Sequence, residues 1–262
     1  MISPSTLIAM CIPGVFSILL FIGLILFYRK KTGLHMKPLL LGAAGFIVFT
    51  QILEKTLHAV VVNAFPTYAD HPWLFGLYGG LAAGHFEELG RFILFIWLLK
   101  KFRDYKTGVS LGIGWGGIEA VLLMVTAMIS NLTFAFMINA GTYESTLGGQ
   151  LPADQLATIK DSLLNQNIGY YLLACVERFF SVFLQIALSL LVLYGVVKKK
   201  FLYVVYAILI HAVIDYPLVF VQTGYIKSLW LVEVYVAIIG ILAMVYIKRM
   251  EKVFPNKEEG AA

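Results

Sequence analysis

Hydrophobic residues form seven long, unbroken runs along this chain, separated by mostly short polar links. A helix needs about 20 apolar residues to cross a bilayer core about 30 Å thick, and each run is at least that long. The runs lack the apolar-polar alternation of β-barrel strands, so helices are predicted. The runs are 4–28, 38–61, 74–99, 107–131, 166–197, 201–222 and 226–247. The pattern predicts an all-α, polytopic transmembrane helical bundle in which residues 1–262 form a single domain.

The composition supports lipid as the solvent for this chain. Of the 262 residues, 60% are hydrophobic, and the mean hydropathy is +0.85. A water-soluble domain of this length could not bury so much apolar surface in its core. Seven crossings use most of the chain, so no separate soluble catalytic domain is expected.

Basic residues predict the orientation of the helices because they gather in alternate links. The links after the first, third and fifth runs and the tail after the seventh hold Arg29, Lys30, Lys31 and Lys37; Lys100, Lys101, Arg103 and Lys106; Lys198, Lys199 and Lys200; and Lys248, Arg249, Lys252 and Lys257. Cytoplasmic links of membrane proteins are enriched in Lys and Arg. We therefore expect the amino terminus outside and the carboxyl terminus in the cytosol. The net charge of +5 is then a topology signal, and no nucleic-acid partner is expected.

The segment 132–165 is the one long link between the runs. It is polar, and the predicted topology places it outside the cell. An access flap and a plain connector are both compatible with this pattern, and we favour the connector.

Several polar groups lie inside the apolar runs, where each carries a free-energy cost and calls for a partner or a function. They are Glu87, Glu88 and Arg91 in the third run, Glu119 in the fourth, Gln185 in the fifth, and His211 and Asp215 in the sixth. Counted at about 1.5 Å per residue from the basic links, Glu87, Glu119, Gln185 and His211 lie at one depth, roughly 16–20 Å from the cytosolic side. Four helices are therefore expected to bring polar groups to one plane.

The spacing of these residues suggests hydrolytic chemistry. Arg91 follows Glu88 by three positions and Glu87 by four, so one cation can hold one carboxylate and leave the other free. A poorly solvated carboxylate can act as a general base on water. His211 and Asp215 are also four apart, an interval that suits one water or one metal ion, with Glu119 as a third ligand. The pattern leaves open a divalent metal such as zinc, held by Glu119, His211 and Asp215.

Three motifs in order resemble those of a known protease superfamily. Glu87-Glu88-x-x-Arg91, Trp115-x-x-x-Glu119 and His211-x-x-x-Asp215 resemble the EExxR/K, FxxxE/H and HxxxD/N motifs of the PrsW and CAAX-protease-like intramembrane proteases. Within that superfamily, the chain looks most like the YhfC family of membrane peptidases. The resemblance extends from about residue 38 to 247 in motif order and helix placement.

The resemblance implies proteolysis within the membrane. Glu87 and Glu88 would be the catalytic carboxylates, and Arg91 would orient them. Glu119, His211 and Asp215 would bind water, an oxyanion or a metal, since members of the superfamily have been described both as metalloproteases and as glutamate-dependent proteases. Two positions depart from the expected pattern: Trp115 stands in place of Phe, and Gln185 stands where a further histidine is expected.

Other polar residues in the runs have plainer interpretations. Glu177 and Arg178 are read first as structural residues that form an ion pair with another helix, and a role in the site is the less favoured alternative. Glu54, Lys55 and His58 are expected to satisfy one another on the second helix. His85 lies within one turn of Glu88 and is read as a residue that either supports the site or simply packs.

Two other functions remain open at this point. Buried Glu, Asp and His residues also serve proton- or cation-coupled transporters, although the chain shows no repeat of the kind transporters use. An inactive, protease-derived binding protein is the third interpretation, favoured by Gln185 alone. The expected substrate is a membrane-embedded or membrane-proximal peptide, and the expected location is a bacterial plasma membrane.

Overall fold

The computed structural model describes residues 1–222, 225–226 and 228–254, and across these residues the chain forms helices and no strand. The predicted all-α, polytopic bundle is confirmed. The elements are α1 (Pro4–Lys31), α2 (Met36–Gly45), η1 (Phe46–Glu54), α3 (Lys55–Ala64), η2 (Tyr68–Asp70), α4 (Pro72–Ile93), η3 (Leu94–Leu98), α5 (Tyr105–Ala140), α6 (Tyr143–Leu147), α7 (Ala153–Asn165), α8 (Ile168–Lys198), α9 (Leu202–Gln222) and α10 (Leu229–Val253). The segments η1 and η3 are π-helical, and η2 is a 3₁₀ turn.

Each predicted run coincides with one helical rod, because α2, η1 and α3 join end to end and α4 continues into η3. Six of the described helices are long and apolar enough to cross a membrane. The seventh rod, α4 with η3, falls short of that hydropathy because it contains Glu87, Glu88 and Arg91 among many glycines. The rod least suited to lipid is therefore the one that carries the acidic pair.

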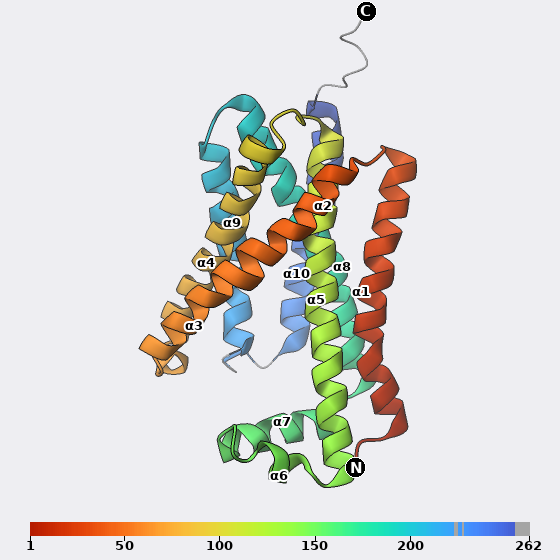
Figure 1. The fold of residues 1–262 in the computed structure, drawn as a ribbon, viewed down its shortest axis with the longest axis vertical. Helices are drawn as coiled ribbons and strands as arrows, with labels where there is room; N and C mark the ends of the chain where they lie inside the picture. The colour runs from red at the N-terminus through yellow and green to blue at the C-terminus, as the bar shows by residue number, and fades with distance from the viewer. Residues whose placement is uncertain (223–224, 227, 255–262) are drawn as a thin grey trace, which may run out of the picture.

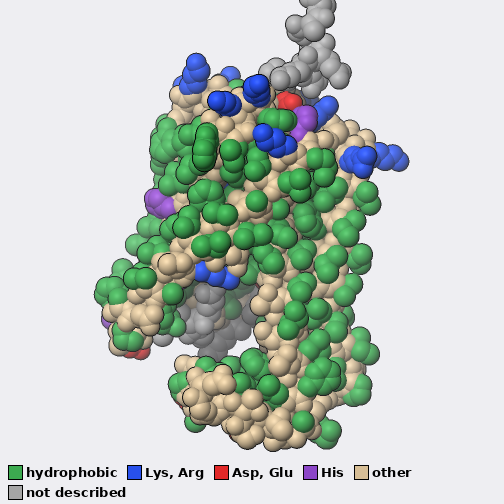
Figure 2. Space-filling view, in the orientation of Figure 1, with side chains coloured by type: hydrophobic (Ala, Val, Ile, Leu, Met, Phe, Trp, Pro, Cys, Tyr) green, Lys and Arg blue, Asp and Glu red, His purple; other side chains and the backbone are tan. Residues whose placement is uncertain are grey.

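The two ends of the bundle differ in charge. The links from α1 to α2, α4 to α5 and α8 to α9 lie at one end together with the carboxyl-terminal end of α10, whereas the amino terminus and the pair α6–α7 lie at the other (Figure 1). Lys and Arg side chains gather at the first end (Figure 2). The alternation of basic links along the sequence thus becomes a separation in space. That this end faces the cytosol stays a prediction.

The link predicted over 132–165 is largely helical. The helix α5 has 36 residues and continues past the expected end at 131 to Ala140, where Gly141 adopts a left-handed φ of 71°. After it, α6 and α7 pack through a small apolar cluster of Tyr143, Leu147 and Leu156. The segment is polar because much of it is exposed outside the bundle. Short amphipathic helices are as polar as an exposed loop, so the sequence pattern did not distinguish the two.

Glycines set the close approach of α4 to α9. A Cβ at Gly80 would lie 2.5 Å from the main-chain oxygen of Ala212, and a Cβ at Gly84 would lie 2.6 Å from that of Ile208. The two glycines are four residues apart, so they share a face of α4, and small residues at this spacing let helix backbones meet in membranes. This contact places the end of α4 that follows Gly84 against the middle of α9.

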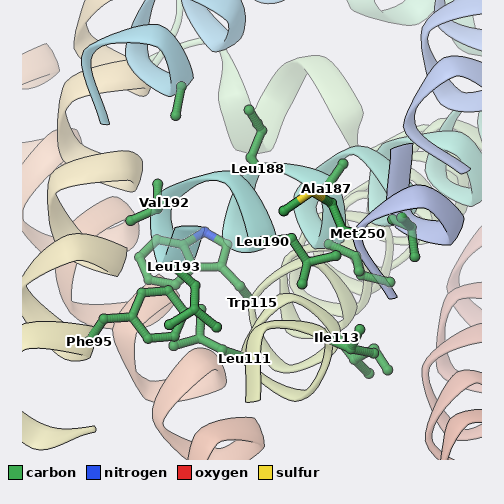
Figure 3. Packing of buried hydrophobic residues seen from close by; sticks show 14 of the residues in the cluster. Phe95, Leu111, Ile113, Trp115, Ala187, Leu188, Leu190, Val192, Leu193 and Met250 are labelled. Atoms are coloured by element: carbon green, nitrogen blue, oxygen red, sulfur yellow. The ribbon is translucent and has the colours of Figure 1, made fainter. Parts of the chain in front are cut away.

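A second set of glycines packs α5 between α2 and α8. A Cβ at Gly112 would lie 2.5 Å from the Cα of Ile186 in α8, and a Cβ at Gly114 would lie 1.9 Å from the main-chain oxygen of Leu39 in α2. Around these contacts the main apolar core forms, with Trp115 fully buried. Figure 3 shows part of this core, including Trp115 and Leu190. The glycine run before Glu119 therefore serves close helix packing.

Candidate active site

The acidic pair on α4 is held by one guanidinium. Nη2 of Arg91 donates a hydrogen bond to Oε2 of Glu87 at 2.9 Å, and Nη1 of Arg91 donates to Oε1 of Glu88. All three side chains are buried, Glu88 and Arg91 completely. The spacings of three and four residues place both carboxylates within reach of one cation on a single helical face. The pair therefore lies inside the bundle with one positive charge between its two negative charges, and the expectation that one carboxylate is left without the cation is wrong.

Trp115 on α5 fixes Glu87 from a second side. Its indole Nε1 donates a hydrogen bond to Oε2 of Glu87 at 2.8 Å. The guanidinium of Arg91 lies over the indole ring, with 4.5 Å between its central carbon and the ring centroid. A buried indole N–H requires an acceptor, and a tryptophan ring is the strongest aromatic partner for a cation. A phenylalanine at this position could not donate the hydrogen bond.

Gln185 on α8 links the acidic pair to Glu119 on α5. Arg91 donates to Oε1 of Gln185, and Nε2 of Gln185 donates to Oε2 of Glu119 at 2.5 Å. The other carboxylate oxygen of Glu119 accepts a hydrogen bond from Nη1 of Arg178 at 3.1 Å. An amide is suited to this position because it accepts on one side and donates on the other. A continuous polar chain therefore runs from α4 across α8 to α5.

His211 on α9 completes the cluster from the opposite side. Its Nδ1 lies 2.7 Å from Oε1 of Glu88, and its Nε2 lies 3.3 Å from Oδ2 of Asp215. The imidazole is buried, whereas Asp215 is partly exposed. Because a carboxylate lies at each ring nitrogen, the plane of the ring is fixed.

A cavity of about 440 Å³ brings several of these groups together. Glu87, Glu119, Gln185, His211 and Asp215 line it, whereas Glu88 and Arg91 are not part of its wall. The rod of η1 and α3 and the helices α8 and α10 supply much of the rest of the wall, together with further residues of α4, α5 and α9. Figure 2 shows the molecular surface hollowed between α3 and the pair α6–α7. The arrangement presents Glu87 and His211 to a space large enough for water and a peptide segment.

The donor atoms of the cluster also fit a metal ion. Glu87, Glu88 and His211 each offer one ligand atom, and these atoms lie within 4.8 Å of one another. Oε2 of Glu88 is buried without a hydrogen-bond partner among the described residues. Two carboxylates and an imidazole match the ligands that catalytic zinc sites use. The structure thus gathers a donor set that shares only His211 with the set expected from sequence, since Glu119 binds Arg178 and Gln185.

The remaining candidate residues divide between the cavity and the lipid-facing side. Arg178 forms an ion pair with Glu177 on its own helix and another with Glu119 on α5. The expected ion pair with another helix is therefore present. Arg178 also lines the cavity, the position that the less favoured interpretation, a role in the site, requires. His85 is exposed, and its Nδ1 lies 2.7 Å from the main-chain oxygen of Leu81, so it turns away from Glu88.

The second helical rod contributes more to the cavity than its sequence indicated. Nε2 of His58 lies 3.2 Å from Oε1 of Glu54, as a self-satisfying cluster predicts, but Lys55 donates to Gln51 at 2.5 Å. Glu54, Lys55 and His58 all line the cavity. The π-helical character of η1, a feature frequent at functional sites, is a signal that only the structure provides.

The fold and the site together define a class of protein. The chain is a multi-pass membrane protein with a buried cluster of carboxylates, a guanidinium and an imidazole beside a cavity among its helices. It belongs to a family described as YhfC intramembrane metalloprotease, whose family model matches residues 16–236.

One curated relative supports this assignment over nearly the whole chain. It is a protein of Bacillus subtilis (strain 168) with the name "Uncharacterized membrane protein YhfC", and it is 37% identical over 257 residues. The alignment covers 97% of this chain and 100% of the Bacillus protein. No solved structure matches the chain.

Proposed function

We propose that this protein is an intramembrane protease that hydrolyses peptide bonds at the cavity lined by Glu87 and His211. The observation that carries the proposal is the arrangement of the acidic pair. Glu88 is buried against Arg91 and His211, whereas Glu87 reaches the cavity. Glu88 is therefore enclosed in the scaffold, whereas Glu87, although held by Arg91 and Trp115, faces the cavity.

Glu87 is the group we assign to water activation. Both of its hydrogen bonds, from Arg91 and Trp115, fall on Oε2. Oε1 is then the oxygen available to a water molecule in the cavity, and a fixed carboxylate can take a proton from that water as it attacks a carbonyl. Arg91 and Trp115 act by orienting the carboxylate.

His211 and Glu119 supply the other polar groups of the proposed site. Asp215 and Glu88 fix the imidazole of His211 from both ring nitrogens, so it meets a substrate in one orientation. Glu119 lines the same cavity and is held by Gln185 and Arg178. We assign these two residues to binding the attacking water and the developing oxyanion.

A divalent metal such as zinc would be held by Glu87, Glu88 and His211, whose donor atoms already converge. When bound, such an ion polarises a carbonyl and makes a bound water more acidic. Asp215 then serves the metal site indirectly, because its carboxylate holds the ring of His211.

The expected substrate is a membrane-embedded or membrane-proximal peptide, since the site lies among spanning helices. We place the protein in a bacterial plasma membrane, by analogy with its Bacillus relative. The family match does not favour a transporter or an inactive binding protein. Gln185, the residue that suggested inactivity, has a structural role between Arg91 and Glu119.

Cleavage of membrane-embedded reporter peptides by the purified, reconstituted protein tests the proposal. We expect Glu87→Gln and His211→Ala to lower cleavage by about a hundredfold or more, and a chelator to do the same. His85→Ala is the matched control, because this histidine lies on the same helix and turns away from the cluster. Wild-type protein that is folded and zinc-supplied but cleaves no reporter would contradict the proposal, as would full activity in both variants.

A further inference from the structure

The cavity wall formed by η1 and α3 carries polar groups that the proposed reaction does not use. Thr50, Glu54 and His58 line the same 440 Å³ cavity as Glu87. Glu54 and His58 also line a second cavity of about 360 Å³, together with Asp215. Glu54 and His58 therefore lie between the two cavities, in the wall that both share, beside the proposed site.

Glu54 has one carboxylate oxygen bound and one free. Oε1 lies 3.2 Å from Nε2 of His58, whose Nδ1 lies 2.7 Å from the hydroxyl of Tyr78. Oε2 is buried and has no hydrogen-bond partner among the described residues, and the whole residue is only 6% exposed. Buried polar atoms are nearly always paired, so an unpaired one beside a cavity calls for an explanation, and a group of a bound ligand would supply the missing partner.

Thr50 provides a second free polar atom on the same face. It precedes Glu54 by four residues, and its Oγ1 is buried without a partner in the described part of the chain. Two unpaired oxygens thus lie about one helical turn apart on one wall of the cavity. A single ligand group with several donors could satisfy both.

The charge of the wall indicates which ligand group fits. Four carboxylates line the cavities, those of Glu54, Glu87, Glu119 and Asp215. The cations of the wall are already engaged: Arg178 by Glu119 and Glu177, and Lys55 by Gln51. The free oxygen of Glu54 therefore calls for a donor from outside, and a cationic nitrogen binds a carboxylate more strongly than a neutral donor does.

We propose that Glu54, assisted by Thr50, forms a specificity subsite for a positively charged group of the substrate, a Lys or Arg side chain near the scissile bond or a free terminal amine. This inference rests on the proposed protease function and names the substrate class for the same cavity. Binding of the cation holds the peptide along the η1–α3 wall, with the carbonyl to be attacked near Glu87.

Reporter peptides that differ at one position test the subsite. One series carries Lys, Leu or Glu on either side of the cleaved bond, and each peptide is made with a free and an acetylated amino terminus. We expect wild-type protein to prefer a cationic peptide by about tenfold or more in kcat/KM, mainly through KM. Glu54→Gln should reduce the preference to about twofold or less, with the larger loss in kcat/KM falling on the cationic peptides.

Two further arms make the outcome decisive. Glu54→Lys should reverse the preference towards the Glu peptide, and Thr50→Val should weaken the preference for cations in the same direction as Glu54→Gln.

If acetylation alone removes the preference, the ligand is the terminal amine; if only the internal residue matters, it is the Lys side chain. Equal loss for Leu and Lys peptides in Glu54→Gln and Thr50→Val would overturn the subsite, because it would assign both residues a structural role.

Peptide binding separates this inference from the proposed function. Fluorescence anisotropy of the same peptides is measured with Glu87→Gln, alone and combined with Glu54→Gln. Tighter binding of cationic peptides that depends on Glu54 supports the subsite even if no variant cleaves, in which case only the protease proposal fails. Equal binding of all peptides to Glu87→Gln, together with equal cleavage by wild-type protein, would overturn the subsite.

Discussion

The hydroxyl of Tyr235 on α10 donates a hydrogen bond to the main-chain oxygen of Val213 on α9, at 3.3 Å, and lies 3.4 Å from that of Ile214. Val213 precedes Pro217 by four residues, and Pro217 lies inside α9. Proline has no N–H, so the carbonyl of Val213 loses its helical partner. Tyr235 replaces that partner within the turn that carries His211 and Asp215.

Tyr235→Phe should therefore destabilise the protein and loosen the proposed site. We expect a loss of about 0.5–1.5 kcal/mol in the free energy of unfolding, the contribution of one hydrogen bond, together with lower reporter cleavage. Thermal unfolding in detergent measures the first effect. Tyr206→Phe, an exposed tyrosine on α9, is the control. Indistinguishable melting of the two variants would show that the contact contributes nothing.

Gln185→Leu should break the polar chain between α4 and α5. Leucine fills a similar volume but neither accepts from Arg91 nor donates to Glu119. Each buried polar group left without a partner costs about 1–3 kcal/mol, so we expect a lower melting temperature and a drop in cleavage. Ser181→Ala, on the same helix and in the same cavity wall, is the matched control. A fully active and stable Gln185→Leu protein would argue against a role for the amide.

Gly80→Ala tests the contact between α4 and α9. The added methyl would lie 2.5 Å from the main-chain oxygen of Ala212, so one helix must shift. We expect destabilisation by about 1–3 kcal/mol, typical of overpacking. Gly23→Ala is the control, because a Cβ there meets nothing within 4 Å. Alanine favours helix, so the control should be neutral or up to about 1 kcal/mol more stable. A stabilised Gly80→Ala protein would contradict the close approach.

Metal binding should depend on the acidic pair and on His211. We expect the purified protein to retain about one zinc ion, measured by mass spectrometry of the metal, and Glu88→Gln and His211→Ala to lose it. Added zinc should raise the melting temperature of wild-type protein. At a zinc concentration a hundred times the dissociation constant, the free energy of unfolding should increase by about 2.7 kcal/mol. Glu177→Gln should bind as wild type does. Unchanged zinc content in both site variants would place the metal elsewhere.

Asp104 should make stability pH-dependent at the basic end of the bundle. Burial alone would raise the pKa of Asp104, but hydrogen bonds from Thr107 and His35 outweigh it and hold the pKa below its ordinary value. A carboxyl with a lowered folded-state pKa stabilises the protein above the unfolded-state pKa of about 3.9, and this contribution disappears as the pH falls through the folded-state value.

Asp104→Asn should therefore flatten the acid side of the stability profile. We expect the wild-type melting temperature to fall more steeply than that of the variant below about pH 4, and the variant to be less stable near neutral pH. Asp161→Asn, an exposed residue on α7 at the opposite end, tests whether any acid side chain gives the same effect. Parallel profiles for wild type and Asp104→Asn would rule out the contribution.

Hydropathy and motif order were sufficient to predict the helical fold, the family and the meeting of polar groups from four helices. The length of each apolar run is set by the bilayer, so seven rods follow from seven runs. The three motifs pointed to Glu87, His211 and Glu119 because charged residues inside apolar runs are rare enough to be informative. The depth of each polar residue within the bundle could be predicted from its distance in sequence to the basic links, because the rise per residue in a helix is constant.

The sequence did not show which face of each helix turns toward which neighbouring helix. Arg178 lies in the amino-terminal half of α8, and nothing in its local sequence indicates that it turns to Glu119. The hydrogen bond from Trp115 to Glu87 depends on the rotation of α5, which is set by Gly112 and Gly114 against α8 and α2. The unpaired oxygen of Glu54 follows from the packing of a whole cavity wall. These features depend on contacts between segments far apart in the sequence, and such contacts cannot be predicted from the hydropathy of each segment.

The modest hydropathy of α4 has a consequence for biogenesis. A rod with two acids and an arginine partitions poorly from the translocon into lipid by itself. Its partner α9, which brings His211 to Glu88 and the backbone surface that Gly80 and Gly84 meet, is synthesised much later. We expect the nascent α4 to stay beside the translocon or at the membrane interface until α9 emerges. Insertion of the chain and assembly of its polar site would then be coupled, and a chain truncated before α9 would leave α4 without this partner.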